Sequence, residues 1–162
     1  MRTLLALALL LAAPAAALGA EHIGAETCKV CHPAAYEAWK EGPHARALEG
    51  LPEARRKDAR CTVCHGPDLE KGSSAVSCET CHGPGRLYAH AHVMRDRELA
   101  RAVGLLDPGE KTCLGCHTES TPSLARFDHA RKLPLIDHWT ADRAERAERL
   151  GRPAAAVPRR AP

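Results

Sequence analysis

The sequence predicts a mostly α-helical protein with extensive irregular loops and little or no β structure, and three observations lead to this fold class. Short stretches of strong helix formers begin at proline and end at glycine or glycine-proline turns. One five-residue motif, CxxCH, occurs four times along the chain. Aromatic residues make up only 3% of the 162 residues, so side chains alone could hardly form a large core. We therefore expect the fold to be organised around the four repeated motifs.

All eight cysteines belong to these motifs. Each motif contributes two cysteines and one histidine: Cys28, Cys31 and His32; Cys61, Cys64 and His65; Cys78, Cys81 and His82; Cys113, Cys116 and His117. CxxCH is the attachment motif of c-type haem, because two thiols at this spacing can bond to the two vinyl groups on one porphyrin edge while the histidine becomes the proximal iron ligand. The sequence thus predicts a small multihaem cytochrome c fold around four covalently bound haems, whose faces supply much of the buried apolar surface.

Three other interpretations of the cysteines compete with haem. Cys61, Cys64, Cys78 and Cys81 resemble a zinc ribbon, although the thirteen residues between the two pairs form a shorter gap than usual. A disulfide scaffold and a thioredoxin-like redox pair are the other two. None of the three requires a histidine after every cysteine pair, so the fourfold repetition of that histidine favours haem.

The two ends of the chain differ from the part between them. Residues 1–20 have the pattern of a signal peptide, with a positive start, a continuous apolar run and small residues near its end; an uncleaved anchor is the alternative. Because haem is attached to CxxCH outside the bacterial cytoplasm, we expect a periplasmic protein without a transmembrane span in the mature chain. Residues 21–140 should form the tetrahaem cytochrome c domain, and residues 141–162 a polar helix and a disordered tail of Arg, Pro and Ala.

Three segments carry specific helix predictions. Residues 33–40 begin with proline at the first helical position, and residues 43–50 are expected to form a second short helix. Residues 86–106 are the longest candidate, about 30 Å if unbroken. On one regular helix, His90 and His92 would point about 200° apart, so they could not both face the same haem.

Six histidines lie outside the motifs: His22, His44, His90, His92, His129 and His138. A single histidine is more often a surface or packing residue than a ligand, but six of them beside four irons in so short a chain change that expectation. We expect at least three to bind iron on the distal side. His44 lies in the opening turn of the helix predicted for residues 43–50, which would hold it rigidly. His22 lies near the expected new N-terminus, where chains fray.

The positive formal charge of the chain does not indicate nucleic-acid binding, because the haems reverse its sign. The formal net charge is +3, and it falls to about +2 when Arg2 is removed with the signal peptide. Each haem contributes about −1 when ferric and about −2 when ferrous. The holoprotein should therefore carry about −2 when oxidised and about −6 when reduced. The Arg-rich tail after Gly151 either meets an acidic partner or is simply solvated.

The residues between the motifs extend the pattern further. Tyr36, Trp39 and His44 follow the first motif, His82-Gly-Pro-Gly is followed by His92, and Ile136-x-His138 follows the fourth motif. With the four motifs in order, this pattern resembles the tetrahaem cytochromes c typified by the nitrifier electron acceptor of hydroxylamine oxidoreductase. The resemblance spans residues 24–138, which is most of the expected mature chain.

The resemblance implies crossed ligation of the irons. His44 would bind the iron of the third haem, His92 that of the first and His138 that of the fourth. The second haem would have an open sixth position. The chain departs from the family in being short and in having additional candidates at His90 and His129. The sixth ligand of the second haem therefore stays open, with His129 as the competitor.

The sequence predicts an electron-transfer protein and no enzyme activity. We expect a carrier that passes electrons between respiratory redox proteins, either donor and acceptor cytochromes or a membrane quinol oxidoreductase. Bis-histidine ligation suits this role because saturated iron has no substrate position and changes little on reduction. The alternative is a small haem enzyme that reduces a nitrogen oxide at an open second haem.

Overall fold

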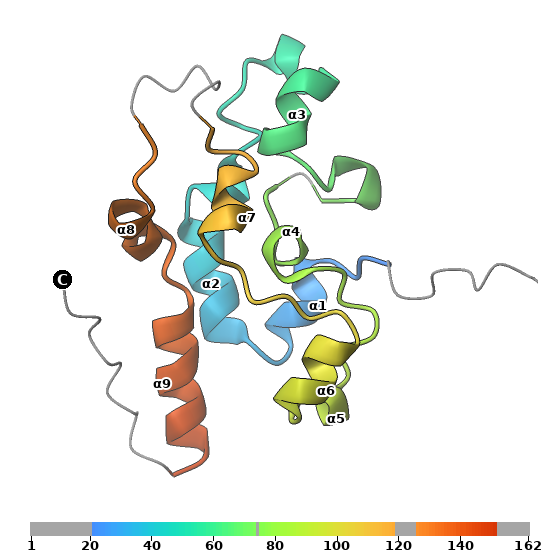
Figure 1. Cartoon of the computed structure of the whole chain (residues 1–162), viewed down its shortest axis with the longest axis vertical. Helices are drawn as coiled ribbons and strands as arrows, with labels where there is room; N and C mark the ends of the chain where they lie inside the picture. Colours follow the sequence, from blue (N-terminus) through green and yellow to red (C-terminus); the bar gives the residue numbers. More distant parts are fainter. Residues whose placement is uncertain (1–20, 74, 119–125, 152–162) are drawn as a thin grey trace, which may run out of the picture.

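A computed structural model describes residues 21–73, 75–118 and 126–151, and within these ranges the chain forms short helices joined by irregular loops, without a strand (Figure 1). The α-helices are α1 (Ala25–Lys29), α2 (Pro33–Glu41), α3 (Ala59–His65), α4 (Cys78–His82), α5 (Ala91–Met94), α6 (Arg97–Ala102), α7 (Glu110–Leu114), α8 (His129–Lys132) and α9 (Trp139–Arg149). The 3-10 turns are η1 (His44–Arg46), η2 (Glu53–Arg55), η3 (Leu69–Lys71) and η4 (Leu133–Ile136). The predicted fold class is confirmed.

The two ends of the chain that carried separate predictions lie largely outside the described residues. The expected signal peptide, residues 1–20, and residues 152–162 of the expected tail belong to this part. Within the described ranges, no helix combines the length and the hydrophobicity that crossing a membrane would require.

The two longest helices, α2 and α9, pack side by side (Figure 1). α2 begins at Pro33 and ends at Glu41 before Gly42, as the sequence predicts. α9 begins beside Asp137, whose carboxylate accepts hydrogen bonds from the backbone N–H groups of residues 139 and 140 at 3.1 and 2.9 Å. Asp142 of α9 is only 8% exposed, so the start of this polar helix belongs to the folded body rather than to a tail.

The prediction of a single long helix over residues 86–106 is wrong. The chain forms two separate helices there, α5 and α6, because Asp96 starts a new one. Its carboxylate accepts hydrogen bonds from the N–H groups of Glu98 and Leu99, both at 3.0 Å, and this local capping competes with continuation of α5. In residues 43–50 only the 3-10 turn η1 forms, which is shorter than the helix we expected.

Few side chains are buried. Among the described residues the buried hydrophobic ones are Tyr36, Ala75, Val76, Tyr88, Val93 and Ala100, and no large side chain is fully enclosed. Tyr88, Val93 and Ala100 pack together where α5 and α6 meet. A protein core this small agrees with the expectation that porphyrin faces supply much of the apolar surface.

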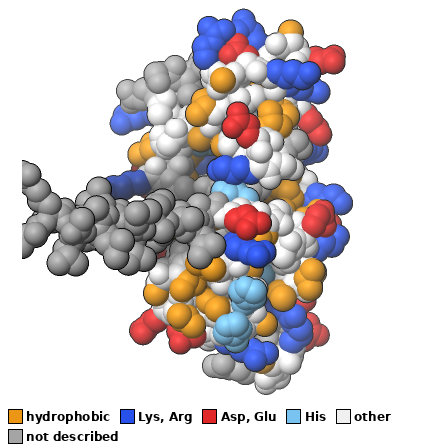
Figure 2. All heavy atoms as spheres, turned by 90° about the vertical axis from the view of Figure 1, so that its right-hand side faces the viewer, with side chains coloured by type: hydrophobic (Ala, Val, Ile, Leu, Met, Phe, Trp, Pro, Cys, Tyr) orange, Lys and Arg blue, Asp and Glu red, His pale blue; other side chains and the backbone are white. Residues whose placement is uncertain are grey.

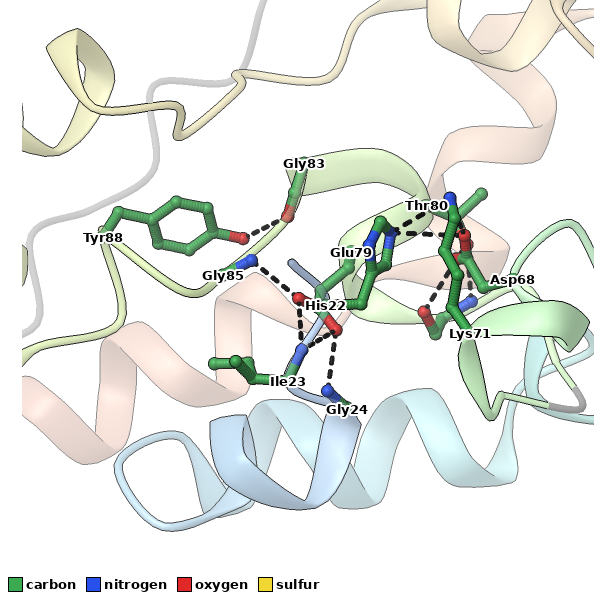
Figure 3. A network of polar contacts seen from close by, with 11 residues as sticks. His22, Ile23, Gly24, Asp68, Lys71, Glu79, Thr80, Gly83, Gly85 and Tyr88 are labelled. Carbon is green, nitrogen blue, oxygen red and sulfur yellow. Dashed lines mark hydrogen bonds and ion pairs between the residues drawn. The ribbon is translucent and has the colours of Figure 1, made fainter. Parts of the chain in front are cut away.

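α4 lies in the middle of the fold, and the first described residues are tied to it (Figures 1 and 3). Glu79 of α4 is 3% exposed. Its carboxylate accepts hydrogen bonds from the backbone N–H groups of Ile23 at 3.0 Å, Gly24 at 2.8 Å and Gly85 at 2.6 Å. A Cβ atom at position 85 would lie 2.7 Å from the Ile23 side chain, so a larger residue there would displace that side chain.

A second buried carboxylate joins the loop after the second motif to α4 (Figure 3). Asp68 is 3% exposed and accepts hydrogen bonds from the hydroxyls of Ser77 and Thr80. It also pairs with Lys71 at 3.2 Å and with Nε2 of His22 at 3.3 Å. His22 is therefore held inside the structure, whereas the sequence suggested a frayed end.

Candidate haem sites

The four CxxCH motifs lie on short helices. α3 and α4 contain their motifs entirely, whereas α1 and α7 each end within theirs. Residues three and four apart in a helical turn share a face, so the two cysteines of a motif and the following histidine project to one side. None of the eight cysteines is paired in a disulfide. Each motif thus presents two thiols and an imidazole together, as attachment of one porphyrin edge requires.

The motif histidines are oriented through their Nδ1 atoms. Nδ1 of His65 lies 2.7 Å from the carbonyl oxygen of Ala47, and Nδ1 of His82 lies 3.2 Å from that of Leu106. Nδ1 of His32 lies 2.9 Å from a side-chain carboxylate oxygen. An acceptor at Nδ1 fixes the tautomer in which Nε2 carries the free lone pair, and this is the usual arrangement of metal-ligating histidines. These three residues therefore fit the role of proximal haem ligands.

Two histidines outside the motifs face motif histidines across a separation that suits one iron. The ring centres of His44 and His117 are 6.2 Å apart, and those of His82 and His138 are also 6.2 Å apart. A metal–imidazole bond is about 2 Å long and the ring centre lies about 1 Å behind the nitrogen, so two imidazoles on opposite sides of one iron have centres about 6 Å apart. Both pairs match this separation.

Three of these rings, those of His44, His82 and His117, have a lowered pKa. Burial lowers the pKa of His44, and the facing ring of His117 lowers it further. Burial also lowers the pKa of His82 and of His117. Since only the neutral imidazole can donate a lone pair to a metal, the local environment favours the form that binds iron.

The ring contacts differ from the ligand pairing that the family resemblance implied. His44 faces the fourth motif where we expected the third, and His138 faces the third motif where we expected the fourth. Nδ1 of His138 lies 2.9 Å from the carbonyl oxygen of Ile136, so Nε2 is the nitrogen left to bind iron.

The remaining histidine candidates are not paired with a motif histidine. His90 and His92 are both exposed and stack on each other with ring centres 5.8 Å apart, so they share one side of the chain. The expectation that they point in opposite directions is wrong, because His90 precedes α5 in extended conformation and only His92 is inside the helix. His129 lies 6.5 Å from the Phe127 ring, and Phe127 stacks on His117 at 4.5 Å.

The thiols of different motifs lie next to one another. A hydrogen bond between Cys28 and Cys78 lowers the pKa of the first thiol and raises that of the second. Burial and the neighbouring Cys64 thiol raise the pKa of Cys116 to about 11. The first motif is thus adjacent to the third, and the second motif to the fourth.

The zinc alternative does not fit this arrangement. In the described part of the chain, no group of three or more His, Cys, Asp or Glu side chains is placed to hold a metal ion by itself. The four cysteines of the supposed ribbon, Cys61, Cys64, Cys78 and Cys81, do not converge. The contacts instead join Cys64 to the fourth motif and Cys78 to the first.

Sequence reasoning missed the buried carboxylates around the motifs. Asp142 supports His32 from 110 residues away, and no local pattern indicates such a contact. Glu79 stands inside the third motif, at a position that the motif leaves unspecified. Its neighbours, two cysteines that must be covered by haem, could have suggested burial.

Known proteins with related sequences provide an independent comparison. The family model described as "Class III cytochrome C family" matches residues 51–131, which is half of the chain. The model described as "Cytochrome c7 and related cytochrome c" matches residues 16–83. Cytochrome c-554 of Nitrosomonas europaea is 30% identical over 96 residues, covering 43% of this chain and 41% of that protein. The chain therefore spans less than half the length of this curated relative.

A solved structure has the same fold. The reduced state of cytochrome c554 from Nitrosomonas europaea superposes on the chain with a TM-score of 0.53 and 23% sequence identity. The match covers 72% of this chain and 78% of that one. It supports the mostly helical, loop-rich fold class predicted from the sequence.

Proposed function

Because the chain belongs to the class III cytochrome c family, and is thus a multihaem c-type cytochrome with four haems, we propose that it carries electrons between redox partners in the periplasm. At two of the four motifs, the motif histidine faces a second histidine, and in each pair the ring centres are 6.2 Å apart. This observation carries the proposal. Iron bound on both sides by histidine offers no position for a substrate, so such haems exchange electrons only.

We assign the axial ligands from the ring geometry. His82 and His138 would bind the third haem, and His117 and His44 the fourth. The family resemblance implies the opposite assignment, with His44 on the third haem and His138 on the fourth. His32 and His65 would be the proximal ligands of the first and second haems. His92, which the resemblance assigns to the first haem, is exposed beside His90 and has no described ring contact with His32.

The order of the haems in space would differ from their order in the chain. Electrons tunnel between haem edges at rates that fall steeply with distance, so haems joined to neighbouring thiols exchange electrons fastest. Cys28 adjoins Cys78, and Cys64 adjoins Cys116. Cys81 and Cys113, of the third and fourth motifs, are also close enough to interact electrostatically. These contacts support an electron path in the order first, third, fourth, second, with the first and second haems at its two ends.

The partners would be other redox proteins, either donor and acceptor cytochromes or a membrane quinol oxidoreductase. Figure 2 shows acidic and basic side chains interspersed over the face it presents, together with several hydrophobic ones. A mixed surface of this kind suits brief encounters better than permanent assembly.

A second candidate function concerns the second haem. In the described part of the chain, no histidine ring faces His65 in the way that His44 faces His117. An iron bound by His65 alone would admit a small ligand, and reduction of a nitrogen oxide there is the alternative activity. His129 is the histidine that would close this position if it moved toward His65.

A mass measurement and a redox titration of the purified holoprotein test the main proposal. The processed chain should carry four haem masses, and all four should be reduced and reoxidised reversibly, one electron each. The ferric spectrum should be low spin for the haems with two histidines. A protein with two haems or fewer, or one whose haems are all high spin, would contradict an electron carrier of this design.

A further inference from the structure

The proximal histidine of the first haem has an acceptor of a different kind from the others. Nδ1 of His32 lies 2.9 Å from Oδ1 of Asp142. Nδ1 of His65 and of His82 lie instead beside neutral backbone carbonyl oxygens, at 2.7 and 3.2 Å. Of the motif histidines whose Nδ1 partner is described, His32 alone faces a charged group.

The carboxylate of Asp142 is largely buried and contacts both His32 and Arg146. Its side chain is 11% exposed, and its second oxygen lies 3.3 Å from a guanidinium nitrogen of Arg146, one turn further along α9. The Arg146 side chain is 49% exposed, so it balances the negative charge only from the solvent side. In this setting the charge of Asp142 acts on the imidazole through little water, which strengthens its effect.

α9 is anchored so that Asp142 keeps its place beside His32. Glu145, three residues further on, accepts a hydrogen bond at 3.3 Å from the backbone N–H of Ala34 at the start of α2. His32 is the residue that immediately precedes α2. The contact between the two helices therefore fixes the carboxylate and the imidazole together.

A carboxylate that accepts the Nδ1 proton gives the imidazole partial anionic character and makes it a stronger donor at Nε2. A stronger anionic donor stabilises ferric iron more than ferrous iron, and outer hydrogen bonding of this kind is one of the levers that set haem potentials. We propose that Asp142 is a positioning residue that holds His32 and lowers the reduction potential of the first haem. This inference rests on the proposed function, in which His32 ligates that iron.

The test is a spectroelectrochemical titration of the four-haem Asp142→Asn protein. Asparagine keeps an oxygen that can accept from Nδ1, but it removes the charge. At a fixed solution potential the ferrous-to-ferric ratio of one haem should rise about tenfold. Loss of a residue that hydrogen-bonds to a metal ligand typically has an effect of this size or larger. For one electron a tenfold change is a shift of about 59 mV. The ferric electron paramagnetic resonance signal of one haem should change as well.

Two further variants separate this role from general loosening of α9. Arg146→Gln leaves the carboxylate unbalanced, so the same potential should fall, in the direction opposite to that of Asp142→Asn. Glu145→Gln removes a neighbouring charge but keeps an oxygen that can accept from the Ala34 N–H, and Glu145 does not touch His32, so the potential should shift much less than in Asp142→Asn. If Asp142→Asn and Arg146→Gln shift the potential in the same direction, packing and not charge is responsible, and the inference is wrong.

The outcomes also separate this inference from the proposed function. Unchanged potentials in an Asp142→Asn protein that holds four haems would overturn the inference and leave the electron carrier intact. Wild-type protein whose haems do not accept and release electrons reversibly would overturn both.

Discussion

Replacing His138 by alanine tests the axial pairing of the third haem. The ring centre of His138 lies 6.2 Å from that of His82, close to the separation of about 6 Å that two imidazoles on one iron require. Alanine has no donor atom, and in the described part of the chain no other histidine ring lies in such contact with His82. One iron in four should therefore lose its sixth protein ligand, so about a quarter of the ferric iron should change from low to high spin.

The same substitution should raise one reduction potential. Imidazole binds ferric haem more tightly than ferrous haem, and each tenfold preference corresponds to about 59 mV for one electron. Loss of His138 removes this preference at one site only. The other three potentials should shift much less, because their ligands are unchanged.

Electron paramagnetic resonance of the ferric protein and a redox titration measure both effects. Leu135→Ala is the matched control, since Leu135 belongs to the adjoining turn η4 and its side chain is 65% exposed. Combining His138→Ala with loss of the third-motif cysteines should add no high-spin iron, whereas combining it with loss of the fourth-motif cysteines should. The reverse result would restore the pairing implied by the family resemblance, and an unchanged spectrum of the single variant would show that His138 is not a ligand.

Three other substitutions or treatments have definite expected outcomes. His44→Ala should convert one further haem, the fourth, to high spin, and an additive effect with His138→Ala would show that the two histidines serve different irons. Wild-type ferric protein should bind cyanide at the second haem; if that haem binds none until His129 is replaced by alanine, then His129 closes that site. Burial would raise the pKa of Asp68, but hydrogen bonds from Thr80 and Lys71 lower it on balance, so its stabilising contribution is present above about pH 4 and is lost as the solution is acidified further. The melting temperature of Asp68→Asn should accordingly change less between pH 6 and about pH 3 than that of the wild type, and equal acid sensitivity would contradict a structural role for this carboxylate.

The sequence was sufficient for what local spacing determines. CxxCH fixes the side-by-side placement of two thiols and an imidazole within about one helical turn, and this arrangement is present in the structure. Pro33 and Gly42 delimit α2 for reasons of backbone chemistry alone. The scarcity of aromatic residues likewise anticipated a small protein core.

Long-range contacts could not be obtained in this way. Residues 86–106 contain many helix formers, but the side chain of Asp96 caps a new helix and so separates α5 from α6. The distal histidines depend on how loops return to the motifs. The resemblance supplied candidates at His44 and His138, and the proposed exchange of their haems rests on ring contacts that only the structure provides. The contact of Asp142 with His32 joins the two ends of the domain, and nothing in either segment indicates the other.

The hydrogen bonds that the Glu79 carboxylate accepts affect how the molecule opens. Chain ends usually exchange their amide hydrogens quickly, because they separate from the body without disturbing it. Here the N–H groups of Ile23 and Gly24 are bound by a carboxylate within the third haem motif, beside the N–H of Gly85. These three amides can be released only when that region of the fold opens, so they should exchange together and slowly, as one cooperative unit. The amides of Ile23 and Gly24 thus report on the integrity of a haem site more than fifty residues away.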